Sequence, residues 1–165
     1  MNIDPGYLFA LCGVVRDVIV AHYADLDVAL PERRLRSPGL PAYDCDELVI
    51  WVERVFPFDG NVTVETVPTL YADPAYMTRG AELSICILRC LPDGDAQGNP
   101  PAVADEEAAT AAILADPVLI WQALIAAHED ETLPGCGAMA FGSWESVTPD
   151  GLLGGGVVRV LLSLE

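Results

Sequence analysis

The residues 81–91 (AELSICILRCL) are apolar on both faces of an extended chain. Leu83 and Ile85 fall on one face, and Cys86 falls on the other. A strand of this kind must be covered on both sides, so the run predicts a central strand of a sheet. A chain of 165 residues is long enough to build that sheet into one domain with its own core.

The segments before this strand have helical and extended patterns. Residues 5–24 repeat apolar side chains every three or four positions, which predicts an amphipathic helix. Residues 47–58 (ELVIWVERVFPF) predict a strand that is buried on both faces or nearly so. Asp59-Gly60-Asn61 is a hairpin signal, so residues 62–67 are expected to form a strand antiparallel to the first.

The segment after the central strand predicts a helical region in two parts. Residues 104–115 predict the first part, which acidic residues open. Asp116-Pro117 has the form of an N-cap and a first-turn proline, and is expected to restart the helix. One face of the second part is expected to cover the sheet, and it carries Val118, Trp121, Leu124, Ile125 and His128.

The end of the chain predicts a closing hairpin. Residues 138–147 and 157–164 form its strands, with a turn at Pro149-Asp150-Gly151 and a hinge at Gly154-Gly155-Gly156. The last strand is expected to be packed on one face and to meet water or another subunit on the other. The packed face carries Val158, Val160, Leu162 and Leu164, and the open face carries Arg159, Ser163 and Glu165.

These elements predict an α/β (α+β) fold in a single domain over residues 1–165. Its mixed or antiparallel sheet of about five strands is flanked by an N-terminal helix and a central helical region, and ends in the β-hairpin. Three extended loops interrupt the domain, at residues 25–46, 68–80 and 92–102.

The charge of the chain restricts its partners. There are 25 acidic residues against 8 basic ones, all arginine, which gives a formal net charge of −17. A surface this negative repels phosphate backbones and anionic lipids, so it argues against tight nucleic-acid or membrane binding. No uncharged apolar run approaches the roughly 20 residues that span a bilayer. Hydrophobic residues nevertheless make up 52% of the chain, which favours burial of apolar surface against partner subunits.

The cysteines indicate a reducing compartment. Their number, 5, is odd and none has CxxC spacing, so neither a disulfide framework nor a zinc site is expected. Cys86 and Cys90 on one strand face lie roughly 13 Å apart, too far for a disulfide. The N-terminus lacks the basic start of a signal peptide, and synthesis and assembly in a cytoplasm are expected.

No residue pattern supports catalysis, a metal site or a cofactor. The carboxylates around Cys45 in Asp44-Cys45-Asp46 would raise its pKa and deactivate the thiol. His22 and His128 lack the spacing of metal ligands. The acidic pairs in residues 25–46 and Asp93-Gly94-Asp95 are better explained as solvated loops than as calcium sites. The triple glycine precedes a strand, whereas a phosphate-binding loop opens a helix.

Loops on a rigid sheet usually carry recognition, so the three loops are the expected partner-facing segments. Residues Arg33 to Arg36 form the only basic cluster and could attract an acidic neighbour, including another copy of this chain; a solvated loop is the alternative. The candidate partner-binding residues are Arg33, Arg34, Arg36, Tyr71, Tyr76, Arg79, Asp93 and Asp95.

The order helix, three strands, helix and hairpin, with AELSICILRCLP, DPVLIWQALIAA and GGGVVRVLLSLE, resembles the tail terminator proteins of long-tailed bacteriophages, especially those of actinobacterial hosts. The absence of lysine suits such a host. The resemblance spans residues 5–165 and rests on segment order and short apolar patterns. It implies a small α/β domain without enzyme activity. Such domains form a hexameric ring that caps the tail tube, ends its polymerisation and joins the head.

The resemblance also implies the partners and the location. The chain would bind copies of itself, the tail tube protein and a head-completion or stopper protein, while genomic DNA passes through the lumen without specific binding. It would lie at the head-proximal end of the tail in the virion, after assembly in the host cytoplasm. Two alternatives stay open: another head–tail connector, or a small ligand-binding or enzymatic α/β domain, which would need a concave polar pocket.

Overall fold

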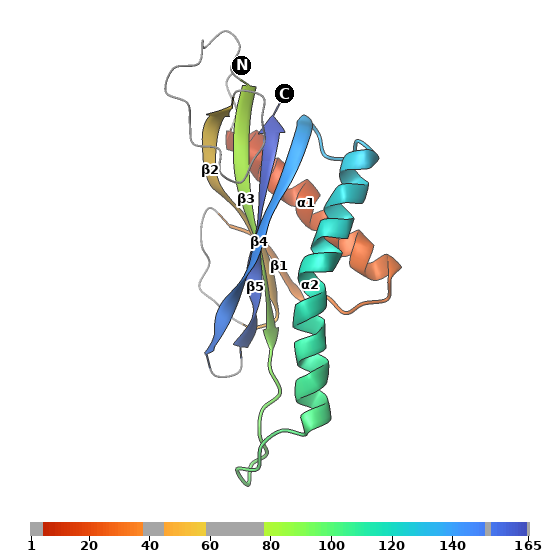
Figure 1. The fold of residues 1–165 in the computed structure, drawn as a ribbon, viewed down its shortest axis with the longest axis vertical. Helices are drawn as coiled ribbons and strands as arrows, with labels where there is room; N and C mark the ends of the chain where they lie inside the picture. The colour runs from red at the N-terminus through yellow and green to blue at the C-terminus, as the bar shows by residue number, and fades with distance from the viewer. Residues whose placement is uncertain (1–4, 38–44, 59–77, 151–152, 165) are drawn as a thin grey trace.

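The computed structural model describes residues 5–37, 45–58, 78–150 and 153–164 of the chain. Within these residues two helices and five strands build one two-layer domain (Figure 1). In chain order they are α1 (Pro5–Asp25), β1 (Arg33–Arg36), β2 (Glu47–Phe58), β3 (Thr78–Cys90), α2 (Val103–Glu129), β4 (Cys136–Asp150) and β5 (Leu153–Leu164).

The strands form one mixed sheet in the order β1-β2-β3-β5-β4. Strand β1 runs parallel to β2, and the other neighbours are antiparallel. Both helices lie on the same side of the sheet, with α1 against β1 and β2 and α2 against β3, β5 and β4 (Figure 1). The predicted α+β fold, with β3 as the central strand and a terminal β4–β5 hairpin, is confirmed.

The main core lies between the helices and the sheet. Helix α1 begins at Pro5, a residue suited to the first helical position, and its predicted apolar stripe packs inward. Leu11, Val15 and Ile19 are at most 1% exposed, because a spacing of four residues puts them on one side of the helix. From β3 the residues Leu83 and Ile85 meet this stripe, as their alternation predicts.

The other face of β3 is also buried. Cys86 and Leu88 are 0% exposed and form a second apolar cluster with Val49 and Trp51 of β2. The prediction that β2 is buried on both faces therefore holds for its first five residues. It fails beyond them, because the residues from Glu53 to Val55 are exposed.

Helix α2 differs from the prediction at its centre. It runs without a break through Asp116 and Pro117, so the predicted restart of the helix is wrong. An internal proline costs a helix about 3 kcal/mol. The side chain of Asp116 does not cap the helix: it is 0% exposed and bound to Arg89 and Tyr23. Packing of this turn on the core offsets the cost of the proline.

The face of α2 that covers the sheet also differs from the prediction. Leu124 is buried, as predicted, and Trp121 packs partly buried against the core. Pro117 and Ile120 are also buried, whereas the predicted Val118 and Ile125 are 45% and 44% exposed. The helix is apolar around much of its circumference, so periodicity alone did not distinguish the inner face from the outer one.

Two segments that the sequence predicts to be irregular contain strand residues. The predicted loop 25–46 contains β1, which pairs in parallel register with β2 from Arg33↔Glu47 to Arg36↔Ile50. The predicted loop 68–80 overlaps the first residues of β3, which begins at Thr78. Residues 92–102 contain no helix or strand, as predicted. The predicted turn 59–61 and strand 62–67 lie outside the described residues.

The triple glycine is part of β5 and not a hinge. Gly155 pairs with Leu88, and Gly156 pairs with Ile87. A Cβ atom at Gly156 would lie 2.5 Å from the ring of Trp144, so glycine lets this ring lie against the strand. The predicted inner face of β5 is confirmed, since Val158, Val160, Leu162 and Leu164 join the main core.

The outer face of β5 is only partly open. Arg159 is exposed, as predicted. Ser163 is 7% exposed, so the prediction of an open face is wrong at this position. Leu161 on the same face packs with Phe56, and Glu165 lies outside the described residues.

Residues Gly6–Asp25 and helix α2 are each long enough and apolar enough to cross a membrane, judged by length and composition alone. Helices that pack on the core of a soluble protein have the same composition, and both of these contribute buried side chains to the core. The composition is therefore weak evidence for a membrane.

Candidate functional site

The three arginines of β1 do not form one patch. Strand alternation sends Arg33 to one face of the sheet and Arg36 to the other. Nη1 of Arg33 lies 2.5 Å from Oε1 of Glu47, whose side chain is 1% exposed. The guanidinium carbon of Arg36 lies 4.1 Å from the ring centroid of Phe9 on α1. Nε of Arg34 donates to the backbone oxygen of Pro31 at 3.1 Å.

These contacts change the expected role of the cluster. Each arginine already has a partner within the chain, so none is simply solvated. The three arginines therefore do not form a single basic binding site. The guanidinium of Arg33 is still accessible, since its side chain is 54% exposed. Arg33, Arg34 and Arg36 therefore put basic groups on the β1 edge, beside the exposed acidic residue Glu32.

The other predicted contact residues lie far from β1 or outside the described part. Tyr71 and Tyr76 are outside the described residues. Arg79 lies at the start of β3, whereas Asp93 and Asp95 follow its end. A strand of 13 residues is about 44 Å long, so these two sets lie at opposite ends of the molecule.

The loop after β3 is held in shape by Asp95. Its Oδ1 accepts hydrogen bonds from the backbone N–H groups of Gln97 and Asn99, both at 2.9 Å. Its Oδ2 accepts one from the side-chain amide of Asn99 at 2.7 Å. The loop surrounds an open hollow of about 660 Å³ between Asp93 and Pro101. It is thus a preformed surface with two exposed carboxylates.

The hydrogen bonds from Asn99 lower the pKa of the Asp95 carboxyl below its ordinary value. The loop geometry is therefore favoured above the ordinary pKa and is lost as the pH falls through the lowered one. We expect Asn99→Ala to raise the Asp95 pKa toward the ordinary value of an aspartate, as followed by carboxyl NMR during a pH titration. Gln97→Ala is the control, because Gln97 contributes only its backbone N–H. An Asp95 pKa that is unchanged in the Asn99 variant would contradict this account.

The cysteines contain a disulfide that the sequence did not predict. Cys45, just before β2, is bonded to Cys90 at the end of β3. The two strands are antiparallel with Glu47 opposite Leu88, and continuing this register brings Cys45 opposite Cys90. The expectation that no disulfide forms is wrong, because an odd cysteine count and the lack of CxxC spacing do not show which cysteines two paired strands bring together.

The disulfide determines how many cysteine thiols can be alkylated once the chain is unfolded. Cys12, Cys86 and Cys136 are not part of the disulfide. Burial raises the pKa of Cys12 to about 11 and that of Cys86 to about 12, so both are unreactive in the folded chain.

We expect alkylation in denaturant to modify three cysteines before reduction and all 5 after it, as measured by intact mass. The Cys45→Ser variant is the control, with four modified thiols under both conditions. Five modified thiols in the wild-type chain without a reductant would exclude the disulfide.

Within the described part of the chain, the remaining chemical candidates lie on or beside separate elements. His22 lies on α1 and His128 lies on α2. Asp44 is outside the described residues, and Asp46 accepts a hydrogen bond from the backbone N–H of Glu32 at 3.1 Å. Among the described residues, no group of three or more His, Cys, Asp or Glu side chains is placed to hold a metal ion.

A buried polar network joins both helices to the sheet. Arg89 of β3 makes two hydrogen bonds to the Asp116 carboxylate, at 2.8 Å and 2.7 Å. The hydroxyl of Tyr23 donates to the same carboxylate at 3.0 Å. Burial and the neighbouring Asp116 raise the pKa of Tyr23, and the hydrogen bonds to Asp116 raise that of Arg89. This network is a structural tie between the helical layer and the sheet.

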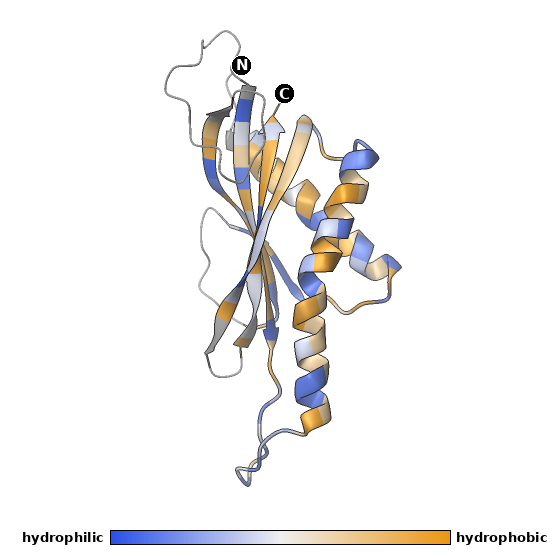
Figure 2. Cartoon of the chain, viewed as in Figure 1, coloured by the Kyte–Doolittle hydropathy of each residue, from blue (hydrophilic) through white to orange (hydrophobic). Residues whose placement is uncertain are grey.

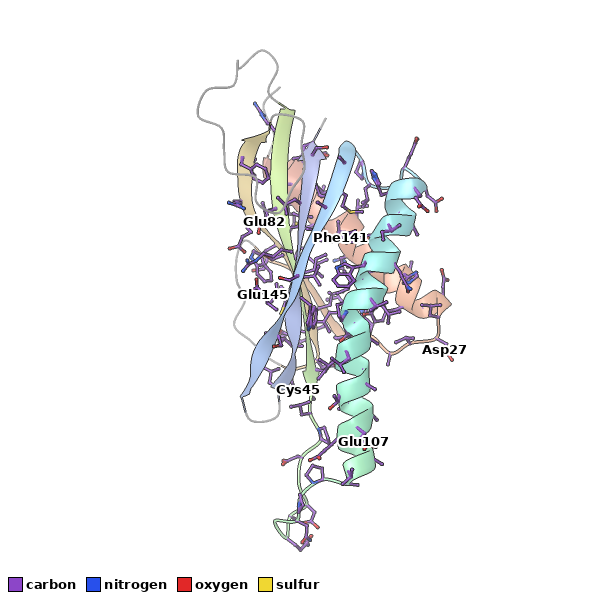
Figure 3. The ribbon with its side chains drawn as sticks, in the orientation of Figure 1. Asp27, Cys45, Glu82, Glu107, Phe141 and Glu145 are labelled. Carbon is purple, nitrogen blue, oxygen red and sulfur yellow. A yellow bond between two sulfur atoms is a disulfide. The ribbon has the colours of Figure 1, made fainter. Side chains whose placement is uncertain are left out.

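A row of charged side chains crosses the helix-free face of the sheet. Glu82 of β3 is paired with Arg54 of β2 and lies 3.8 Å from Arg159 of β5. Arg159 in turn lies 3.1 Å from Glu145 of β4. Figure 3 shows Glu82 and Glu145 on the side of the sheet away from α2, whereas Phe141 points between the sheet and α2. Sequence reasoning missed this row, because its members lie on four different strands.

These features describe surfaces suited to contacts with other macromolecules: the two edges of the described sheet, a preformed acidic loop and a charged sheet face. No protein-family model matches the chain, and no curated protein sequence is significantly similar to it.

Proposed function

We propose that this chain is a structural subunit that caps the tail tube of a long-tailed bacteriophage. In this proposal a hexameric ring of copies sits on the finished tube, ends its polymerisation and presents the surface that joins the head. The proposal is based on the resemblance to tail terminator proteins, and the α+β domain with its terminal hairpin agrees with the fold that this resemblance implies.

The observation that carries the proposal is the shape of the loop between β3 and α2. It extends beyond the end of the sheet at one end of an elongated domain (Figure 1). Its conformation is set by the hydrogen bonds of Asp95 before any partner arrives. A preformed loop binds with less loss of conformational entropy, which suits a subunit that must recognise the end of a tube.

The charge of the chain supports the same role. A net charge of −17 on each copy makes a ring strongly negative. DNA that passes through such a ring is repelled by its walls and does not bind to them.

The test is the growth of purified tail tube protein from the same phage, with tube lengths measured by electron microscopy. Added wild-type chain is expected to stop growth and to appear at one end of each tube. Asp95→Ala, which removes the acceptor that shapes the loop, is expected to weaken this effect at least about tenfold, whereas Gln97→Ala should not. A chain that leaves tube length unchanged would overturn the proposal. Binding to the portal side of the head instead would indicate another head–tail connector.

A further inference from the structure

The two edges of the sheet differ in charge. Helix α1 and strand β1 lie at one edge, and α2 and β4 lie at the other. The first edge carries Arg16, Arg33, Arg34 and Arg36, together with the exposed acidic residues Asp17, Asp25, Asp27 and Glu32. The second edge carries no arginine or lysine, because the whole stretch from residue 90 to residue 158 has neither. The charged side chains of the first edge are therefore mixed in sign, whereas those of the second edge are acidic.

The acidic edge also has an exposed apolar stripe. On α2 the side chains of Leu114, Val118 and Ile125 are 65%, 45% and 44% exposed. Their spacings of four and seven residues put them on one side of the helix over roughly 16 Å. Hydrophilic stretches lie before and after this stripe (Figure 2). Their acidic residues are Asp105, Glu106, Glu107, Glu129, Asp130 and Glu131.

The partly positive edge has apolar groups of its own. Phe9 on α1 is 48% exposed, and the guanidinium of Arg36 lies over its ring. Leu26 and Val28, just after α1, are 48% and 37% exposed. Arg16, also on α1, has a side chain that is 27% exposed. This edge therefore combines apolar surface with basic groups, the complement of the α2 stripe.

We propose that the α2 stripe of one copy docks against the α1–β1 edge of a second copy. Charge favours this occupant, because the acidic residues around Leu114 and Ile125 then meet an edge that carries four arginines as well as its own acidic residues. Two α2 stripes packed on each other would instead bring acidic ends together. An anionic membrane would be repelled by the same acidic residues.

This contact is head-to-tail, since it uses two different surfaces of the chain. Each added copy leaves one unused α2 stripe and one unused α1–β1 edge, so the contact can repeat and close into a ring. This contact specifies how the ring of the proposed function is assembled, and in this respect it rests on that function. The contact itself can be tested without any tube.

The test uses two variants that each lose one surface. Leu114→Glu with Val118→Glu breaks the α2 stripe, and Phe9→Glu with Arg16→Glu breaks the α1 edge. Ala96→Glu, on the exposed loop before α2, is the control for added charge. Masses in solution are measured by light scattering over a concentration series, and circular dichroism checks that each variant is folded.

We expect the wild type and the Ala96 variant to form higher masses as concentration rises, and each double variant alone to stay monomeric. A mixture of the two double variants should form a complex of twice the monomer mass, because each still has the surface that the other lacks. A monomeric wild type, or a mixture that stays monomeric, would overturn the proposal. So would an α1-edge variant that still dimerises, which would indicate α2-to-α2 pairing.

The outcomes for the two proposals can be separated. If copies associate head-to-tail but do not stop tube growth, the contact stands and the proposed function fails. If both double variants stop tube growth as the wild type does, the proposed function stands and the contact is wrong. Binding to vesicles of phosphatidylglycerol that is lost in the Leu114 and Val118 variant, without self-association of the wild type, would also overturn the contact.

Discussion

Replacing Asp116 by alanine is expected to lower the free energy of unfolding by about 3–5 kcal/mol, because it leaves a buried charge without its partner. The carboxylate is 0% exposed and accepts two hydrogen bonds from Arg89 and one from Tyr23. The Arg89 side chain is only 13% exposed, so water cannot replace the lost carboxylate well.

Urea unfolding monitored by circular dichroism, without a reductant so that the disulfide is kept, measures this effect. Glu145→Ala is the matched control: it breaks an exposed ion pair with Arg159 and should cost at most about 1 kcal/mol. Combining Asp116→Leu with Arg89→Met removes both charges and is expected to recover most of the loss. An Asp116→Ala variant within about 1 kcal/mol of the wild type would show that the network does not tie the layers together.

The second large effect is expected at Gly155, where alanine should cost about 4 kcal/mol or prevent folding. The backbone at Gly155 has φ of +152°, which side-chain-bearing residues rarely adopt. A Cβ atom there would lie 2.0 Å from the backbone oxygen of Ile87 on the neighbouring strand. Since that oxygen belongs to the central strand, β3 and β5 would have to separate.

Gly98 is the matched control, because alanine at this position tests the cost of a positive φ without a steric clash. Its φ is +83°, yet nothing lies within 4 Å of an added Cβ atom. Gly98→Ala should therefore cost only about 1 kcal/mol in the same urea experiment. If Gly155→Ala gives only inclusion bodies, Gly142→Ala tests the same sheet, with a Cβ 3.3 Å from Arg159 and a cost between the other two. Equal costs at Gly98 and Gly155 would contradict the steric account.

Parts of the fold could be predicted because their signals are local. The alternation around Leu83 and Ile85 identified a central strand with two buried faces, and the repeat in α1 identified its inner side. The terminal hairpin followed from two strand-like runs and a turn. Each of these patterns lies within one element or, for the hairpin, within two adjacent elements. Residues close in sequence were therefore enough to predict it.

Other parts could not be predicted because they depend on residues distant in sequence. The restart predicted at Pro117 failed, since Arg89 and Tyr23 draw Asp116 inward and the core holds the helix together. The disulfide joins Cys45 to Cys90, 45 positions apart, and requires the β2–β3 register. The candidate surfaces likewise combine residues from several helices and strands, so no single segment of the sequence predicts them.

By itself the sequence determined the fold class, the strongly acidic charge and the order of the main elements, because composition and periodicity are properties of the chain. Only the tertiary structure decided which side of α2 is buried, where the β1 arginines point and which residues share an edge. The physical reason is that local patterns specify how a segment coils or extends. The contacts between segments then select one face, one register and one set of neighbours.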